Sequence, residues 1–156
     1  MSLFETIDSR AILPTRATQG SAGYDLYSLD PVKLYSLEGP MILRTGIKVN
    51  IPVGYCGQLW CRSKWGSKGA LVHDFATTPD GDILHGRLID SDYTNEVGVI
   101  MSNIGLDTLT FKAGEKIAQM VIVPFYSEED VNVLRTGGFG STDALTVSLP
   151  EPKAAL

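Results

Sequence analysis

Glycine and proline are spread through the whole chain, and their spacing constrains the fold more than any other feature. The 156 residues include 16 glycines and 8 prolines, and both residue types interrupt regular secondary structure. The segments between them are too short for long helices. The sequence therefore predicts many short strands joined by turns.

Between these breaks, apolar and polar residues alternate as they do in half-buried strands. Ile47, Val49 and Ile51 alternate with polar residues, and a Pro-Val-Gly turn follows them. Further strands are expected at 55–61, 70–75, 97–101 and 117–125, the last apolar enough to be buried on both faces. Hairpin turns are expected at Asp80-Gly81 and Thr94-Asn95. Many short strands without a helical period predict an all-β fold, a sandwich or a jelly-roll-like β-barrel.

Composition and charge exclude several classes of protein. Hydrophobic residues make up 44% of the chain and charged residues 20%, which argues against intrinsic disorder. Apolar runs fall well short of the ~18 residues that a membrane span needs. The net charge of −5 has the wrong sign for gripping polymeric nucleic acid. A small polyanion such as a nucleotide stays possible, because it needs only a local cluster of donors.

The ends of the chain and the cysteines indicate the compartment and the domain organisation. The N-terminus lacks the basic and apolar regions of a secretory signal, and two cysteines are too few for a disulfide framework, so a cytoplasmic location is expected. Residues 1–130 are expected to form one β domain. Residues 131–156, which include a glycine-rich stretch at 137–142, are expected to form a flexible C-terminal arm and tail.

Two polar segments in the first half of the chain have both a plain and a functional interpretation. In AGYDL at 22–26, Asp25 stands between aromatic residues, and an edge strand explains this as well as a site does. In RSKWGSKG at 62–69, backbone N–H groups of a helical turn together with Arg62 would bind phosphate. Taken alone, this second segment is better explained as a solvated basic loop.

Three more polar segments lie further along the chain. Asp90 follows an apolar pair, where a carboxylate either deprotonates a water or closes an Asx-turn. Gln119 interrupts an apolar run and needs partners, of which a ligand is one possibility. The arm from Arg135 to Thr142 has the composition of a lid.

Histidines and cysteines give no sign of a zinc site. His73 and His85 have no Cys or Glu at ligand spacing. Cys56 and Cys61 lie in or beside a predicted strand and are interpreted as core residues.

Together, the five polar segments resemble, in their order and in their residues, the five motifs of the homotrimeric dUTP pyrophosphatases (dUTPases). The matching segments run from residue 22 to residue 142 and are AGYDL, Arg62-Ser63 with Gly66 and Lys68, IDSDY at 89–93, Gly114 with IAQ at 117–119, and GGFGST at 137–142. The resemblance implies a jelly roll whose trimer places three sites at subunit interfaces. It also implies hydrolysis of dUTP to dUMP and pyrophosphate with Mg²⁺ on the triphosphate, which keeps uracil out of DNA and supplies dUMP for dTMP synthesis.

The resemblance also implies a role for each matching residue. Asp90 would activate the water that attacks the α-phosphorus, and Asp25 would hold Mg²⁺ through water. Tyr93 would pack on the deoxyribose and exclude a 2′-hydroxyl, and the segment from Leu88 to Gly98 would read the uracil edge as a hairpin. The residues implied to bind substrate are Arg62, Ser63, Lys64, Gly66, Leu88, Tyr93, Gly98, Gln119, Arg135, Phe139, Gly140, Ser141 and Thr142.

The chain departs from the family pattern at several positions. Twenty-four residues separate Ser63 from Leu88, more than is usual, so we expect an extra hairpin within 70–86 that is a possible contact for a protein partner. Arg87 stands where most members have a small residue, and Thr94-Asn95 replaces the usual Arg-Gly pair. Arg135 is one residue closer to Phe139 than in the pattern.

Three other functions stay open at this point. A dCTP deaminase shares the fold but needs a catalytic glutamate in the third segment. A dUTP-gated regulatory protein would use the extra segment to contact a partner. A purely structural jelly roll would not require five matched polar motifs.

Overall fold

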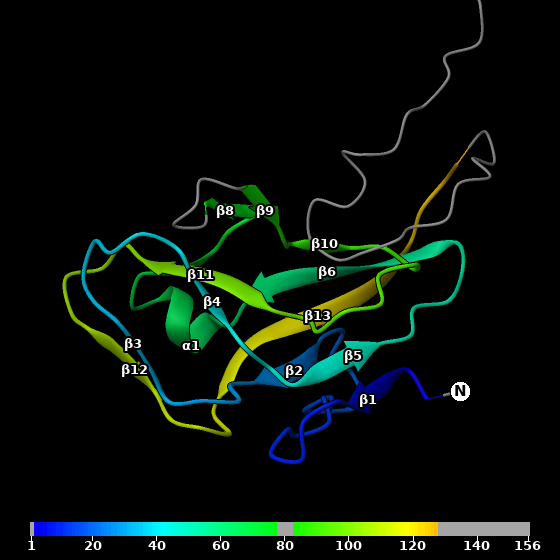
Figure 1. Cartoon of the computed structure of the whole chain (residues 1–156), viewed down its shortest axis with the longest axis horizontal. Helices are drawn as coiled ribbons and strands as arrows, with labels where there is room; N and C mark the ends of the chain where they lie inside the picture. The colour runs from blue at the N-terminus through cyan, green and yellow to red at the C-terminus, as the bar shows by residue number, and fades with distance from the viewer. Residues whose placement is uncertain (1, 78–82, 128–156) are drawn as a thin grey trace, which may run out of the picture.

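The computed structural model describes residues 2–77 and 83–127, which contain thirteen strands and one short helix (Figure 1). The strands are β1 (Phe4–Thr6), β2 (Tyr24–Tyr27), β3 (Val32–Leu34), β4 (Met41–Leu43), β5 (Ile47–Val49), β6 (Tyr55–Cys61), β7 (Ala70–Val72), β8 (Phe75–Thr77), β9 (Ile83–His85), β10 (Leu88–Ile89), β11 (Val99–Asn103), β12 (Leu109–Phe111) and β13 (Lys116–Pro124). The helix α1 spans Ser63–Gly66. Within the described residues, no helix has the length and apolar character needed to cross a membrane. The expected all-β, jelly-roll-like fold is confirmed.

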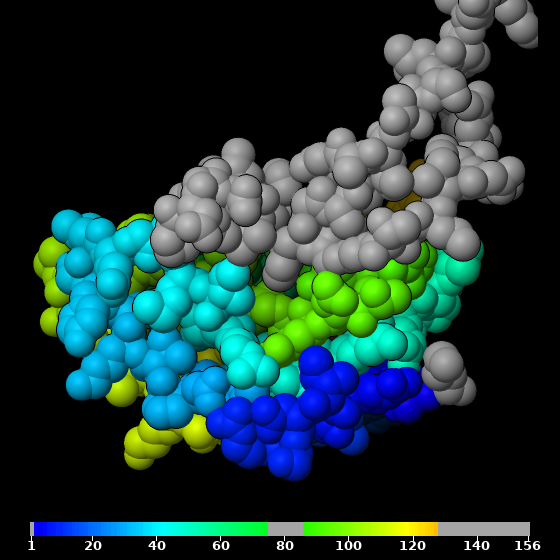
Figure 2. Space-filling model, viewed as in Figure 1, coloured from blue at the N-terminus to red at the C-terminus, as the bar shows by residue number. Residues whose placement is uncertain are grey.

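All the strand pairs are antiparallel, and the largest sheet has the order β10-β6-β13-β2. A second sheet has the order β4-β11-β7, and the pairs β1-β5, β12-β3 and β8-β9 complete the set among the described residues. In Figure 1, β3, β12 and α1 lie toward one end of the molecule and β8-β9 lies along one edge. Figure 2 shows the N-terminal segment (blue) forming another edge of the same face.

The core is built from the inward-facing residues of these short strands. Ile47 and Val49 of β5 are buried on either side of the half-buried Lys48, which is the alternation expected from the sequence. Trp65 of α1 packs on Phe111 of β12, with ring centroids 4.5 Å apart. Burying each large apolar side chain contributes roughly 1.5–3 kcal/mol, so many short strands together stabilise one core.

Several predicted strands differ in extent from the observed ones. The strand expected at 70–75 is divided into β7 and β8, which have different partners, since β7 pairs with β11 and β8 pairs with β9. Strand β13 is buried in its first half, but Val121, Ile122 and Val123 are only half-buried, so the expectation of burial on both faces is wrong. The extra hairpin is confirmed by the pairing of β8 with β9, although the Asp80-Gly81 turn lies outside the described residues.

The hairpin expected around Thr94-Asn95 is also wrong. Strand β10 pairs with β6, and β11 pairs with β4 and β7, so the strands on either side of this turn are not partners. Residues 90–98 form a loop in which Tyr93 N–H donates to Asp90 O at 3.1 Å. The local composition indicated a break between strands, but the turn lies at Ser91-Asp92 and Asn95 forms only a bend, and composition does not determine which strands pair.

Candidate active site

A polar cavity of about 240 Å³ lies where β2, β13 and the end of β6 meet α1. It brings together five residues that the sequence singled out. The lining residues are Ala17, Ser21, Gly23, Asp25, Arg62, Ser63, Lys64 and Gln119. The described structure therefore places parts of the first, second and fourth motifs around one cavity.

Asp25 is a buried carboxylate held between two cations. Asp25 is only 5% exposed, and its Oδ1 lies 3.0 Å from Arg62 Nε. Oδ2 lies 2.7 Å from Lys116 Nζ, but the angles of this ion pair are not those of a hydrogen bond, and Oδ2 has no hydrogen-bond partner within the described part of the chain. Because a buried carboxylate is costly to leave unpaired, the two cations offset the cost of burying it.

Gln119 reaches the cavity because residue 23 has no side chain. The register of β13 against β2 places Gln119 opposite Asp25, and its Nε2 donates to Cys61 O at 3.4 Å. A Cβ on Gly23 would lie 2.5 Å from Gln119 Oε1 and 3.0 Å from Gln119 Cβ. Gly23 therefore provides the space for the Gln119 amide beside Asp25.

The short helix α1 positions the residues of the second motif. Arg62 precedes the helix in an extended conformation, and its carbonyl accepts the N–H groups of Trp65 and Gly66. Gly66 does not line the cavity, so its predicted phosphate contact stays a prediction. Lys64 Nζ lies 2.9 Å from Glu115 Oε1 and 4.4 Å from the centroid of the Trp65 ring, which restricts this cation beside the cavity.

Two ionisable groups next to the cavity have shifted pKa values. Burial raises the pKa of the Cys61 thiol. Burial also raises the pKa of Glu115, but hydrogen bonds from the Lys112 N–H and from Lys64 outweigh it and leave that pKa below its ordinary value. Near neutral pH these shifts favour a neutral thiol and an ionised carboxylate beside Lys64.

Asp90 follows β10, at the far edge of the sheet that carries Asp25. Strands β6 and β13 separate β10, which Asp90 follows, from β2, which carries Asp25, a distance of three strand spacings or ~14 Å. Along the strands, Ile89 is opposite Gly57, whereas Gln119 is opposite Trp60, a further offset of ~10 Å. Within one chain, Asp90 therefore does not reach the cavity beside Asp25.

The residues predicted for the sugar and base also lie near Asp90, away from the cavity. Tyr93 is 4% exposed, and its hydroxyl donates to Glu96 O at 2.8 Å. Leu88 is 59% exposed and Gly98 is buried. The arm residues Arg135, Phe139, Gly140, Ser141 and Thr142 lie outside the described residues.

Two charged residues near these segments were missed by the sequence analysis. Lys116 is the second cation on Asp25, and the Glu96 carboxylate bonds to residues 44–46. Each looks like an ordinary surface charge in the sequence. Only the position of Lys116 at the start of the predicted strand carrying Gln119 hinted that it would approach the cavity.

The donors in the cavity suit Mg²⁺ held indirectly and do not suit direct chelation. Asp25 is the one carboxylate among the described residues that line the cavity, and no cluster of three or more His, Cys, Asp or Glu residues occurs in residues 2–77 and 83–127. Mg²⁺ usually keeps several waters and binds proteins through one or two carboxylates together with substrate phosphates. Asp25 fits the first of these roles.

Comparison with known proteins relates this arrangement to one family. The family model described as dUTPase matches residues 9–143. A deoxyuridine 5′-triphosphate nucleotidohydrolase of Clostridium kluyveri is 37% identical over 150 residues, covering 92% of this chain and 98% of its own. The enzyme of that name from Clostridium novyi is 35% identical, covering 90% and 96%.

Solved structures give the same relationship. The D95N mutant dUTPase of phage phi11 of S. aureus, which reveals the coordination of a structural Mg(II) ion, has a TM-score of 0.68 at 25% identity and covers 83% of this chain and 94% of its own. A dUTPase mutant of the staphylococcal phage 80alpha has the same TM-score at 26% identity, covering 88% and 96%. The extent of the family match, the identity to curated relatives and the clustered motif residues lead to one conclusion: this chain belongs to the dUTPase family.

Proposed function

We propose that this protein hydrolyses dUTP to dUMP and pyrophosphate. The observation that carries the proposal is the cavity in which Arg62, Ser63, Lys64 and Gln119 surround the buried carboxylate of Asp25. Cations, a hydroxyl and an amide are the groups that bind phosphates. The family match and the names of the relatives supply the nucleotide.

In this proposal the cavity binds the triphosphate. The Arg62 guanidinium, Ser63 hydroxyl and Lys64 ammonium contact phosphate oxygens, and the Gln119 amide donates to one of them. Mg²⁺ bound to the triphosphate supplies charge neutralisation, and Asp25 accepts hydrogen bonds from its waters. The Gly66 N–H donates to Arg62 O, so it binds a phosphate oxygen only if that hydrogen bond breaks.

Asp90 is the proposed general base. It accepts a proton from the water that attacks the α-phosphorus, and the cavity groups stabilise the charge that develops on the phosphate oxygens. Leu88 and Gly98 contact the uracil, and Tyr93 packs on the deoxyribose. Phe139 stacks on the base, while Arg135, Gly140, Ser141 and Thr142 close on the γ-phosphate.

We further propose that the active protein is a homotrimer with each site shared between subunits. The ~14 Å and ~10 Å offsets between Asp25 and Asp90 support this, because a site holding both requires a second copy. The β10-β6-β13-β2 sheet also exposes apolar side chains on β10 and β6, with Leu88 59% and Trp60 44% exposed. Such a face is typical of an interface.

A cytoplasmic location agrees with two cysteines that form no disulfide.

A second candidate function is regulation of a protein partner through the 70–86 segment. The hairpin β8-β9 is closed at its base by Gly86 N–H donating to Asp74 O at 2.9 Å, so it is a distinct element at the edge of the molecule (Figure 1). The dUTPase of Staphylococcus bacteriophage 80alpha is described as controlling the transfer of virulence genes by a G protein-like mechanism. A regulatory role would accompany nucleotide binding.

The experiment measures pyrophosphate and ammonia release from dUTP, dCTP, dTTP and UTP with Mg²⁺. We expect pyrophosphate from dUTP alone. Asp90→Asn should bind dUTP normally but lose roughly 10²–10⁴-fold in kcat, because it keeps the shape and removes the base. Asp107→Asn, a change at an exposed aspartate, is the matched control.

Each other result points to a different function. Ammonia release from dCTP would make the protein a deaminase. Tight dUTP binding without turnover by the wild type would favour the regulatory protein. Near-normal turnover by Asp90→Asn would remove Asp90 from the catalytic role.

A further inference from the structure

The segment from Asp90 to Gly98 lies outside the strand ladders yet is held firmly against the core. It joins β10 to β11, which belong to different sheets. Its Val97 N–H donates to Ile47 O at 2.8 Å, and Tyr93 and Val97 are buried. Contacts other than strand pairing therefore hold the loop between Tyr93 and Val97 in place.

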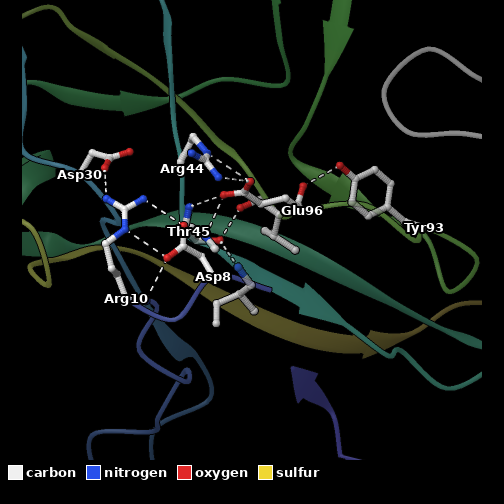
Figure 3. Close-up of polar contacts among 10 residues, drawn as sticks. Asp8, Arg10, Asp30, Arg44, Thr45, Tyr93 and Glu96 are labelled. Carbon is white, nitrogen blue, oxygen red and sulfur yellow. Dashed lines mark hydrogen bonds and ion pairs between the residues drawn. The ribbon is translucent and has the colours of Figure 1, made fainter. Parts of the chain in front are cut away.

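The Glu96 carboxylate supplies much of this attachment (Figure 3). Its Oε1 accepts the backbone N–H groups of Gly46 at 2.8 Å and Thr45 at 3.1 Å. Its Oε2 accepts Nε and Nη2 of Arg44 at 3.2 Å and 3.1 Å. Hydrogen bonds in which a partner is ionised are stronger than neutral ones, so four such bonds from one side chain tie the loop to residues 44–46.

Two further hydrogen bonds complete the attachment around Glu96. The Tyr93 hydroxyl donates to Glu96 O at 2.8 Å, and Thr45 Oγ1 donates to Val97 O at 2.5 Å. Tyr93 is in turn bonded to Asp90 through its N–H. A continuous path of hydrogen bonds thus runs from Asp90 through Tyr93 and Glu96 to the turn at 44–46.

We propose that Glu96 is a positioning residue for catalysis and for sugar discrimination. It fixes the places of Asp90 and Tyr93 relative to the core without touching the substrate, and this inference rests on the proposed dUTP hydrolysis. Catalytic groups must be held within about 0.5 Å of their productive positions. The bonds of Glu96 to the core supply that constraint for a loop that has no strand partner.

This role predicts a particular kinetic signature. The triphosphate cavity is built on β2, the end of β6, α1 and β13, and within residues 2–77 and 83–127 the hydrogen bonds of Glu96 go to residues 44–46 and to Tyr93 instead. Loss of the Glu96 carboxylate should therefore lower kcat for dUTP while changing KM little. Discrimination against UTP should also fall, because Tyr93 is the proposed barrier to a 2′-hydroxyl.

The test compares Glu96→Ala and Glu96→Gln with the wild-type protein. Glu96→Ala is expected to lower kcat for dUTP by roughly 10- to 100-fold and to weaken discrimination between dUTP and UTP. Glu96→Gln keeps an oxygen acceptor for the Thr45 and Gly46 N–H groups and should restore most of kcat. Glu38→Ala is the matched control, since it removes a carboxylate that accepts one backbone N–H, from Tyr35 at 3.1 Å, far from this loop in the sequence.

Amide hydrogen exchange provides a readout that does not depend on the reaction. In Glu96→Ala, the amides of residues 90–98 should exchange faster than in the wild type, while those of β6 and β13 should not change. Unchanged exchange in 90–98, or unchanged kcat and discrimination, would overturn the positioning role. A loss of kcat fully explained by the fraction of Glu96→Ala that is unfolded at the assay temperature would also overturn the positioning role. If Glu96→Ala speeds amide exchange in residues 90–98 as expected but the wild type does not hydrolyse dUTP, the proposed function fails and the structural role of Glu96 stands.

Discussion

Gly69 and Gly105 approach so closely that a side chain on Gly105 should displace the end of α1. Ile104 N–H donates to Gly69 O at 2.9 Å. A Cβ on Gly105 would lie 2.4 Å from Lys68 O, about 1 Å closer than the 3.4 Å at which ordinary contact begins. Gly105→Ala is therefore a defined displacement of the turn at 67–69.

The size of the effect follows from the connection of this turn to the cavity. Ser67 N–H donates to Ser63 O and Lys68 N–H donates to Trp65 O, both at 3.0 Å, so a shift of about 1 Å at Lys68 is transmitted to Ser63. Overpacking of this kind costs about 1–3 kcal/mol in the free energy of unfolding. A 1 Å misplacement costs up to ~10²-fold in kcat/KM, and we expect it mainly in KM because Ser63 and Lys64 line the cavity proposed to bind phosphate.

The assay combines urea unfolding with steady-state hydrolysis of dUTP. Gly39→Ala is the control, since a Cβ there meets no heavy atom within 4 Å, and neither quantity should change. If Gly105→Ala matches Gly39→Ala in both quantities, the close approach is not real. A loss of stability with an unchanged KM would refute the link between this contact and the position of α1.

Two further predictions concern the shifted pKa values. Burial raises the pKa of Cys61, and its Sγ lies 3.5 Å from both Arg62 O and Ala70 O. Iodoacetamide should therefore alkylate Cys61 more slowly in the native protein than in urea. Equal alkylation rates would contradict this prediction. Hydrogen bonds from Arg10 hold the pKa of Asp8 at about 2 against an ordinary 3.8, so their stabilisation is present above about pH 4 and is lost as the pH falls toward 2. The difference in unfolding free energy between wild type and Asp8→Asn should shrink over that range, and a constant difference would exclude the pairing as its cause.

Local sequence patterns were sufficient to predict much of the β structure. Strand β6 occupies the expected residues 55–61, because a run bounded by turn residues at both ends has few alternatives. The motif residues Asp25, Arg62 and Gln119 come together at one cavity, since β2, β6 and β13 are neighbours in one sheet. Strand neighbours are not encoded in local patterns, so here the resemblance to a family carried the prediction.

Features that depend on distant partners were predicted poorly. A hairpin turn was predicted at Thr94-Asn95, but the turn lies at Ser91-Asp92 and the flanking strands pair elsewhere. The burial of β13 was overestimated because an apolar run does not reveal that both faces of its second half are covered only in part. Lys116 and Glu96 belong to residue types that usually stay solvated, and their contacts with Asp25 and with residues 44–46 exist only in the folded chain.

The charges around the cavity are compatible with the proposed binding of a triphosphate by an acidic protein. The chain carries a net charge of −5, yet in the described part of the chain Arg62, Lys64 and Lys116 gather beside two carboxylates, those of Asp25 and Glu115. Each cation is held near the cavity by a carboxylate, which limits the side-chain entropy lost when phosphate binds. In the proposed function, a triphosphate would compete with Asp25 and Glu115 for these cations, and Mg²⁺ bound to that triphosphate would give Asp25 a new positive partner. The same carboxylates thus keep the cations in place before binding and make the exchange to phosphate possible without leaving a buried charge unpaired.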